Sequence, residues 1–180
     1  MAPLWEATRE FRIYSPFLVP GPVQSAAYIR ALLVAVRNRR PNVVDDIEDA
    51  VEARLARQHV TYEGDHQFTI VLEENVLRHQ IGGADVLREQ LEHLRSSMSL
   101  PSVRLGIIPF SADRLLLHPV EMFFMHDDAQ VNVELVSGWL RVTQPSEVEM
   151  YAQAFARLSE MAVHGRAARV LITRAIKIIE

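Results

Sequence analysis

Three prolines and a glycine stand within the first seven residues after Ser15, in the stretch SPFLVPGPVQSAAYIRALL (15–33). Proline fixes the backbone angle φ and glycine frees it, so the run Pro20-Gly21-Pro22 predicts one defined bend. Residues after the bend have helical spacing, and Gln24 and Tyr28, four apart, are expected on one helix face. The chain therefore has to turn at a fixed place before its first long helix.

Hydrophobic periodicity predicts the elements that follow. Strands are expected over 67–73, 102–109 and 120–126. Helices are expected over 42–58, over 81–98, from a capping box formed by Ser146 and Glu149 to near Gly165, and over 166–179.

A β-hairpin is predicted over 130–144, where apolar and polar residues alternate on both sides of Ser137-Gly138. If those two residues form the turn, Val136 faces Trp139 and Glu134 faces Arg141. The residues expected to share the buried face are Val131, Val133, Leu135, Leu140 and Val142.

The order of these elements predicts an α+β fold. Helices and a strand come first, then a helix, three or four strands and two helices, which favours a mixed, mainly antiparallel sheet of about four to five strands packed by amphipathic helices. At 180 residues and 49% apolar, the chain is long enough for one buried core. We therefore expect a single domain over 1–180.

Composition excludes several classes of function. The chain has no cysteine, so disulfides, thiolate catalysis and cysteine-bound zinc are excluded. Its net charge of −4 disfavours direct DNA binding, and no apolar run approaches the ~20 residues that span a membrane. The seven histidines form no known ligand spacing. We expect a cytoplasmic protein without membrane segment, metal or cofactor.

Paired acids at Glu73-Glu74 end the predicted strand 67–73, with Arg78 four residues further on. Strand alternation puts Glu74 on the face of Phe68, Ile70 and Leu72, which we expect to be the core side. A carboxylate there must be paired or hydrogen-bonded. It is either part of a structural ion pair or a ligand-binding or catalytic group.

Several segments together resemble a known family, the domain of unknown function that follows an Xre-type helix-turn-helix in many actinobacterial transcription regulators. LVPGPVQSAAYIRALL is similar to its Val-Pro-Gly-Leu-Leu-Gln-Thr and Tyr-Ala-Arg-Ala stretches, and RLARQ matches its Arg-x-x-Arg-Gln. EENVLRHQIGGADVLREQLEHL and IIPF match two further motifs. The family's glycine-rich loop is replaced here by SADRLLLHPVEMFF.

The resemblance implies an effector-like domain. As a departure from the family pattern, we expect that no helix-turn-helix precedes residue 1, so the family's DNA binding is not carried over. The candidate ligand-binding residues are Gln24, Tyr28, Arg30, Arg57, Glu74 and Arg78.

Two functions follow as hypotheses. The first is a stand-alone regulatory domain that binds a small molecule, a partner protein or a second copy of itself as a homodimer. The alternative is a cofactor-independent enzyme, such as a cyclase or isomerase of natural-product biosynthesis, because the loop that replaces the glycine-rich segment is apolar and aromatic. Its candidate catalytic residues are Glu74, His118, Glu121 and His126.

Overall fold

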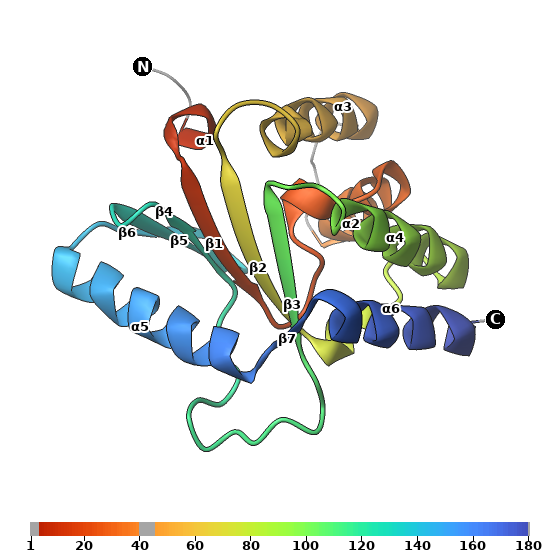
Figure 1. Ribbon diagram of the computed structural model, residues 1–180. Coiled ribbons are helices and arrows are strands. Elements are labelled where there is room, and N and C mark those ends of the chain that lie inside the picture. The colour runs from red at the N-terminus through yellow and green to blue at the C-terminus, as the bar shows by residue number, and fades with distance from the viewer. Residues whose placement is uncertain (1–3, 40–45, 180) are drawn as a thin grey trace.

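A strand that the periodicity analysis did not identify, β1 (Glu10–Ser15), lies in the middle of the sheet. The computed structural model describes residues 4–39 and 46–179. Within them the sheet has seven strands in the order β6-β5-β4-β1-β2-β3-β7 (Figure 1). The other strands are β2 (Gln67–Glu73), β3 (Val103–Ile108), β4 (Phe123–His126), β5 (Gln130–Leu135), β6 (Gly138–Val142) and β7 (Val163–His164).

The centre of the sheet is parallel, because β1 pairs with β2 and β2 with β3 in the same direction. Parallel neighbours need crossover connections, which here contain α2 (Ala26–Asn38), α3 (Ile47–Arg57) and α4 (Ala84–Ser97). The prediction of a mixed α+β fold is confirmed. Its strand number was too low. Of the six strand pairings in the described residues, four are antiparallel as expected and the two at the centre are parallel.

The helices form a layer on each side of the sheet (Figure 1). α2, α4 and α6 (Gly165–Ile179) lie on one side, and α5 (Pro145–Met161) lies on the other. The short helix α1 (Leu4–Ala7) precedes β1. No helix in the described part of the chain is both long and apolar enough to cross a bilayer.

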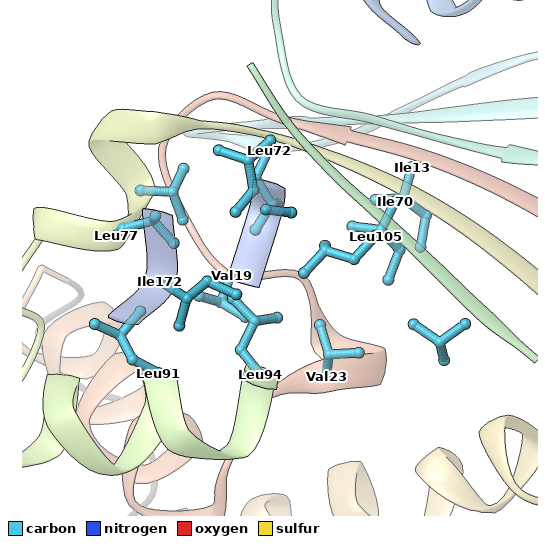
Figure 2. Close-up of a cluster of buried hydrophobic side chains, with 14 of the residues drawn as sticks. Ile13, Val19, Val23, Ile70, Leu72, Leu77, Leu91, Leu94, Leu105 and Ile172 are labelled. Atoms are coloured by element: carbon cyan, nitrogen blue, oxygen red, sulfur yellow. The ribbon is translucent and has the colours of Figure 1, made fainter. Parts of the chain in front are cut away.

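One core fills the space between the sheet and the layer of α2, α4 and α6. Alternate residues of the parallel strands, such as Ile13, Ile70 and Leu105, meet Leu91 of α4 and Ile172 of α6 there (Figure 2). These five side chains are 3% exposed or less. Burying each one contributes about 1.5–3 kcal/mol relative to leaving it in water.

A second core lies under α5, on the opposite face. Tyr14, Val71 and Phe123 point to this side and pack with Phe155 and Leu158. β2 is thus buried on both faces, as parallel strands usually are. This explains why its sequence, QFTIVLE, carries apolar residues at successive positions.

The hairpin pairs in a register different from the predicted one. Leu135 pairs with Gly138, so the turn is formed by Val136 and Ser137, and Glu134 lies opposite Trp139. Arg141 pairs with Asn132 and not with Glu134.

The register difference amounts to two residues, so each side chain keeps its predicted face. Val131, Val133 and Val142 are buried as expected. Leu135 and Leu140 remain 48% exposed, because they belong to the end of the hairpin and to an edge strand.

Three predicted helix boundaries need correction. α3 begins at Ile47, and residues 42–45 of the predicted helix 42–58 lie outside the described residues. α5 begins at Pro145, and its N-cap Gln144 makes no side-chain cap, so the expected capping box does not start this helix. α5 also ends at Met161, and the two-residue strand β7 precedes α6.

The predicted bend is a short 3₁₀ turn, η1 (Gly21–Val23). Gln24 follows it in an extended conformation, so it is not on the helix face of Tyr28, contrary to the prediction. α2 starts at Ala26, and the side chain of its N-cap residue, Ser25, accepts a hydrogen bond from the Tyr28 N–H. The hydroxyl of Tyr28 accepts a hydrogen bond from the Val19 N–H at 3.3 Å.

Buried amide side chains hold this bend from two sides. Gln90 of α4, fully buried, accepts from the Ser25 N–H at 2.7 Å and donates to the Val23 carbonyl at 2.8 Å. Gln58, in the 3₁₀ turn η2 (Gln58–Thr61), donates to the carbonyls of Gly21 and Gln24 at 2.7 and 2.9 Å. Backbone groups that the prolines leave outside regular structure are thereby paired.

We expect Gln90→Leu to lower the free energy of unfolding by about 2–4 kcal/mol, because it leaves one buried N–H and one buried carbonyl unpaired. Urea denaturation measures the change. The control is Gln153→Leu on α5, whose exposed side chain bonds only Glu149 and should change stability by less than about 0.5 kcal/mol. Equal stability of the two variants would contradict the role given to Gln90.

Candidate functional site

A pocket of about 360 Å³ lies between the antiparallel half of the sheet and the wall formed by the bend, α2 and α3. Its lining comes from segments far apart in sequence. They are α1, the residues from Leu18 to Gln24, α2, α3 with η2, and the strands β4 to β6. The bend therefore forms part of a pocket wall as well as the start of α2.

Three aromatic side chains line this pocket, each from a different element. Trp5 of α1 and Phe124 of β4 have ring centroids 6.5 Å apart, and Phe124 and Trp139 of β6 have centroids 6.3 Å apart. Trp5 and Trp139 are the two tryptophans of the chain. Trp139 is 62% exposed, so much of its indole surface is free to contact another molecule.

An unpaired amide oxygen belongs to the same wall. Gln24 lines the pocket and is 3% exposed, and its Nε2 donates to the Val19 carbonyl at 2.7 Å. A carbonyl only accepts, so this bond fixes which end of the amide is the nitrogen. The Oε1 of Gln24 has no hydrogen-bond partner among the described residues. A buried acceptor without a donor is uncommon and destabilising.

Charged side chains at the pocket are mainly basic. Arg39, Arg54 and Arg57 line it together with one acid, Glu134. Within the described residues, none of these three arginines has a carboxylate within the 4 Å of an ion pair. Burial and the neighbouring Arg57 lower the pKa of Arg54, and Glu134 partly opposes that shift.

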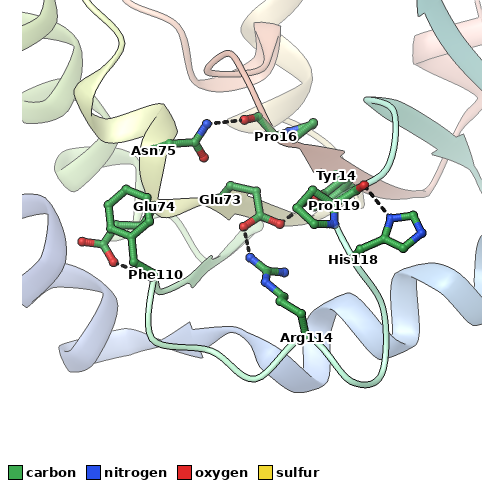
Figure 3. Close-up of polar contacts among 9 residues, drawn as sticks. All are labelled: Tyr14, Pro16, Glu73, Glu74, Asn75, Phe110, Arg114, His118 and Pro119. Atoms are coloured by element: carbon green, nitrogen blue, oxygen red, sulfur yellow. Dashed lines mark hydrogen bonds and ion pairs between the residues drawn. The ribbon is translucent and has the colours of Figure 1, made fainter.

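A second polar cluster lies where the parallel strands end (Figure 3). Glu73, 5% exposed, accepts a hydrogen bond from the Tyr14 hydroxyl at 2.7 Å through one oxygen. Its other oxygen pairs with the guanidinium of Arg114, from the loop that follows β3. Burial and the bond to Glu73 raise the pKa of Tyr14.

The neighbouring Glu74 is not on the core face of β2, contrary to the prediction. β2 ends at Glu73, and Glu74 begins the 3₁₀ turn η3 (Glu74–Arg78), so strand alternation no longer applies to it. Glu74 accepts from the Phe110 N–H at 2.8 Å and lies 3.9 Å from Arg78. Together, Glu73 and Glu74 fasten the loop after β3 to the end of β2.

The four candidate catalytic residues do not meet. Glu74 bonds as described, His118 contacts the Pro119 carbonyl, and Glu121 accepts from the Tyr151 hydroxyl at 2.6 Å. His126 is 2% exposed, between Thr8 and Asn132. No hydrogen bond or ion pair joins any two of the four.

The candidate ligand-binding residues divide into two groups. Gln24 and Arg57 line the pocket. Tyr28 is buried behind the bend, and Arg30 makes a bidentate ion pair with Glu48 on the surface, with both distances at 2.7 Å. Glu74 and Arg78 belong to the cluster at the end of β2.

Sequence reasoning did not identify the aromatic lining or Arg54 as part of a site. One available signal was the spacing of Arg54 and Arg57, which puts both on one face of α3. The other was the occurrence of just two tryptophans in the chain. Nothing local in the sequence connects those features, because the fold brings them together over more than 80 residues.

The chain belongs to the family described as a domain of unknown function (DUF5753), whose model matches residues 4–174. This match covers every element that lines the pocket and the Glu73 cluster. Among curated proteins, none matches the sequence.

We expect Glu73→Ala to lower the free energy of unfolding by about 3 kcal/mol or more, because it leaves the Tyr14 hydroxyl and the Arg114 guanidinium without their buried acceptor. Glu74→Ala, the adjacent control, should cost about 1 kcal/mol, since it removes one backbone hydrogen bond at a wetter position. Chemical denaturation measures both. A larger effect at Glu74 would contradict this assignment of the buried acid.

The stability of the protein should fall in acid because of His126. Burial lowers the pKa of His126 to about 4, whereas an unfolded histidine titrates near 6.5. Between these two pKa values the histidine is protonated in the unfolded chain and neutral in the folded chain. The free energy of unfolding therefore falls as the pH drops from about 6.5 and levels off near pH 4.

The contribution amounts to about 2 kcal/mol between pH 7 and pH 5. Urea denaturation at both pH values, with and without His126→Gln, measures it. Between pH 7 and pH 5, the free energy of unfolding of the variant should fall by about 2 kcal/mol less than that of the unmodified protein. An NMR titration that finds the ring of His126 protonated at pH 6 would contradict the expectation.

Proposed function

We propose that this protein is a ligand-binding domain of the effector type, and that the pocket beside the Pro-Gly bend takes a small molecule with a flat apolar body. The observation that carries the proposal is the meeting of both tryptophans at one pocket whose wall includes Gln24, a residue with a buried and unpaired amide oxygen. The resemblance to an effector-like domain of transcription regulators is consistent with this function.

The size and lining of the pocket support binding. A volume of about 360 Å³ is within the range of small-molecule sites, which combine mainly apolar walls with few polar groups. Trp5, Phe124 and Trp139 provide flat surfaces against which a ring can stack. Leu32 and Val36 of α2 add aliphatic contacts.

Gln24 would orient the bound ligand through a hydrogen bond. Its Oε1 is an acceptor without a donor, so a ligand N–H or O–H that reached it would remove the cost of that unpaired atom. Its Nε2 is already engaged by Val19. Because this oxygen is buried in the wall, the Gln24 side chain has to shift for such a contact, and ligands that donate there would then be favoured over ligands that do not.

The alternative of a cyclase or isomerase receives no comparable support, because Glu74, His118, Glu121 and His126 are distributed over separate contacts. Binding of a protein partner and formation of a homodimer stay predictions. So does action together with a separate DNA-binding protein.

The proposal is tested with N-phenyl-1-naphthylamine, a neutral, flat, fluorescent probe. We expect it to bind with enhanced emission on direct excitation, to quench tryptophan fluorescence and to raise the melting temperature. Trp139→Ala should weaken binding at least about fivefold while leaving stability nearly unchanged, because this side chain is mostly exposed.

Phe110→Ala is the matched control, since Phe110 is an aromatic side chain of similar exposure, 64%, beside the Glu73 cluster. It should bind the probe like the unmodified protein. Absence of binding, or equal loss in both variants, would overturn the assignment of the pocket.

A further inference from the structure

Positive charge is concentrated at the pocket of a chain that is acidic overall. The net charge of the chain is −4, whereas the pocket lining has three arginines and one glutamate. Several other arginines are neutralised by a neighbouring carboxylate, as Arg30 is by Glu48 and Arg88 by Asp85. The three pocket arginines have no such partner within the described residues, and what sets them apart from other unpaired arginines, such as Arg157, is that they line one pocket together.

Within this positive region, Arg54 and Arg57 are the two arginines that come from the same helix, α3. They are three residues apart on α3, so their guanidinium groups project from the same side of the helix. Their mutual repulsion acts on Arg54, which is only partly exposed, and Glu134 offsets it incompletely. An anion bound in the pocket next to these two arginines would relieve the repulsion between them and accept charge-assisted hydrogen bonds from their guanidinium groups.

The apolar surface adjoins these arginines within one pocket. Guanidinium groups match carboxylate, sulfonate or phosphate oxygens because they present planar, paired donors. A ligand that uses both surfaces must therefore carry a negative head group next to a flat apolar body.

We propose that the ligand is a small organic anion, whose head group is held by Arg54 and Arg57 while its ring system contacts the indoles. This inference rests on the function proposed above and specifies the class of ligand. It also states what the two arginines do. They select charge, while Trp139 and the wall around Gln24 provide affinity for any flat body.

The test compares two probes that share a phenyl-naphthylamine body. One is 1-anilinonaphthalene-8-sulfonate, which is anionic, and the other is neutral N-phenyl-1-naphthylamine. We expect Arg54→Gln and Arg57→Gln each to weaken the anionic probe about tenfold, the scale of one charge-assisted hydrogen bond. Binding of the neutral probe should change less than about twofold.

Arg157→Gln is the control for net charge, because Arg157 is exposed on α5, on the opposite side of the sheet. It should leave both probes unaffected. Added salt should weaken binding of the anionic probe and leave binding of the neutral probe unchanged, since salt screens exposed charges. Melting curves of all three variants show that they remain folded.

The outcomes separate the two proposals. If the neutral probe binds in a Trp139-dependent way and neither arginine variant affects the anionic probe, the anion inference is wrong and the ligand-binding function stands. If binding of neither probe depends on Trp139, both proposals are wrong. An equal loss of both probes in the arginine variants would also overturn the anion inference, because it would show a general disturbance of the pocket.

Discussion

The pairing of the backbone at the Pro-Gly bend is the constraint on which the rest of this structure depends. Pro20 and Pro22 cannot donate backbone hydrogen bonds, and the 3₁₀ turn η1, which contains Pro22 and precedes α2, leaves carbonyls without helical partners. Gln90 and Gln58 supply these bonds from α4 and η2. Three segments that are distant in the sequence are thereby locked together beside the central strand.

This arrangement explains why a polar residue is fully buried in the middle of α4. Gln90 lies among Leu87, Leu91 and Leu94, where an apolar side chain would match its neighbours better. Burial of its amide is tolerable because both ends are bonded. The same bonds fix the position of the wall that carries Gln24, so the stability of the core and the shape of the pocket share one cause.

Much of the fold could be predicted from the sequence where the pattern is periodic. β2 has the predicted bounds, and α4 and α6 differ from prediction by at most three residues at each end. β1 was missed although Phe11 and Ile13 alternate with polar Arg12, because a six-residue strand gives a weak periodic signal. The hairpin turn was displaced because Ser137-Gly138 offered a familiar turn sequence, whereas the strands pair around Val136-Ser137.

The sites were harder to predict, for a physical reason. The prediction that Glu74 faces the core assumed that β2 extends to this residue. Because β2 ends at Glu73, the buried acid is Glu73 and not Glu74. Gln24, a candidate ligand-binding residue, lines the pocket, but its predicted placement on a helix was wrong. The pocket itself depends on the fold bringing α1, the hairpin and α3 around one space, which no local pattern encodes.

The two sides of the pocket differ in how firmly they are fixed before anything binds. The side of the bend is bonded through Gln58, Gln90 and Tyr28, so its ordering was completed during folding. On the other side, Trp139 stands mostly in solvent on an edge strand, where it keeps rotamer freedom. Preorganised contacts cost little conformational entropy on association, whereas immobilising a free side chain costs about 0.5–1.5 kcal/mol. The fixed side thus sets which shapes are accepted, and the adaptable indole adjusts to their thickness.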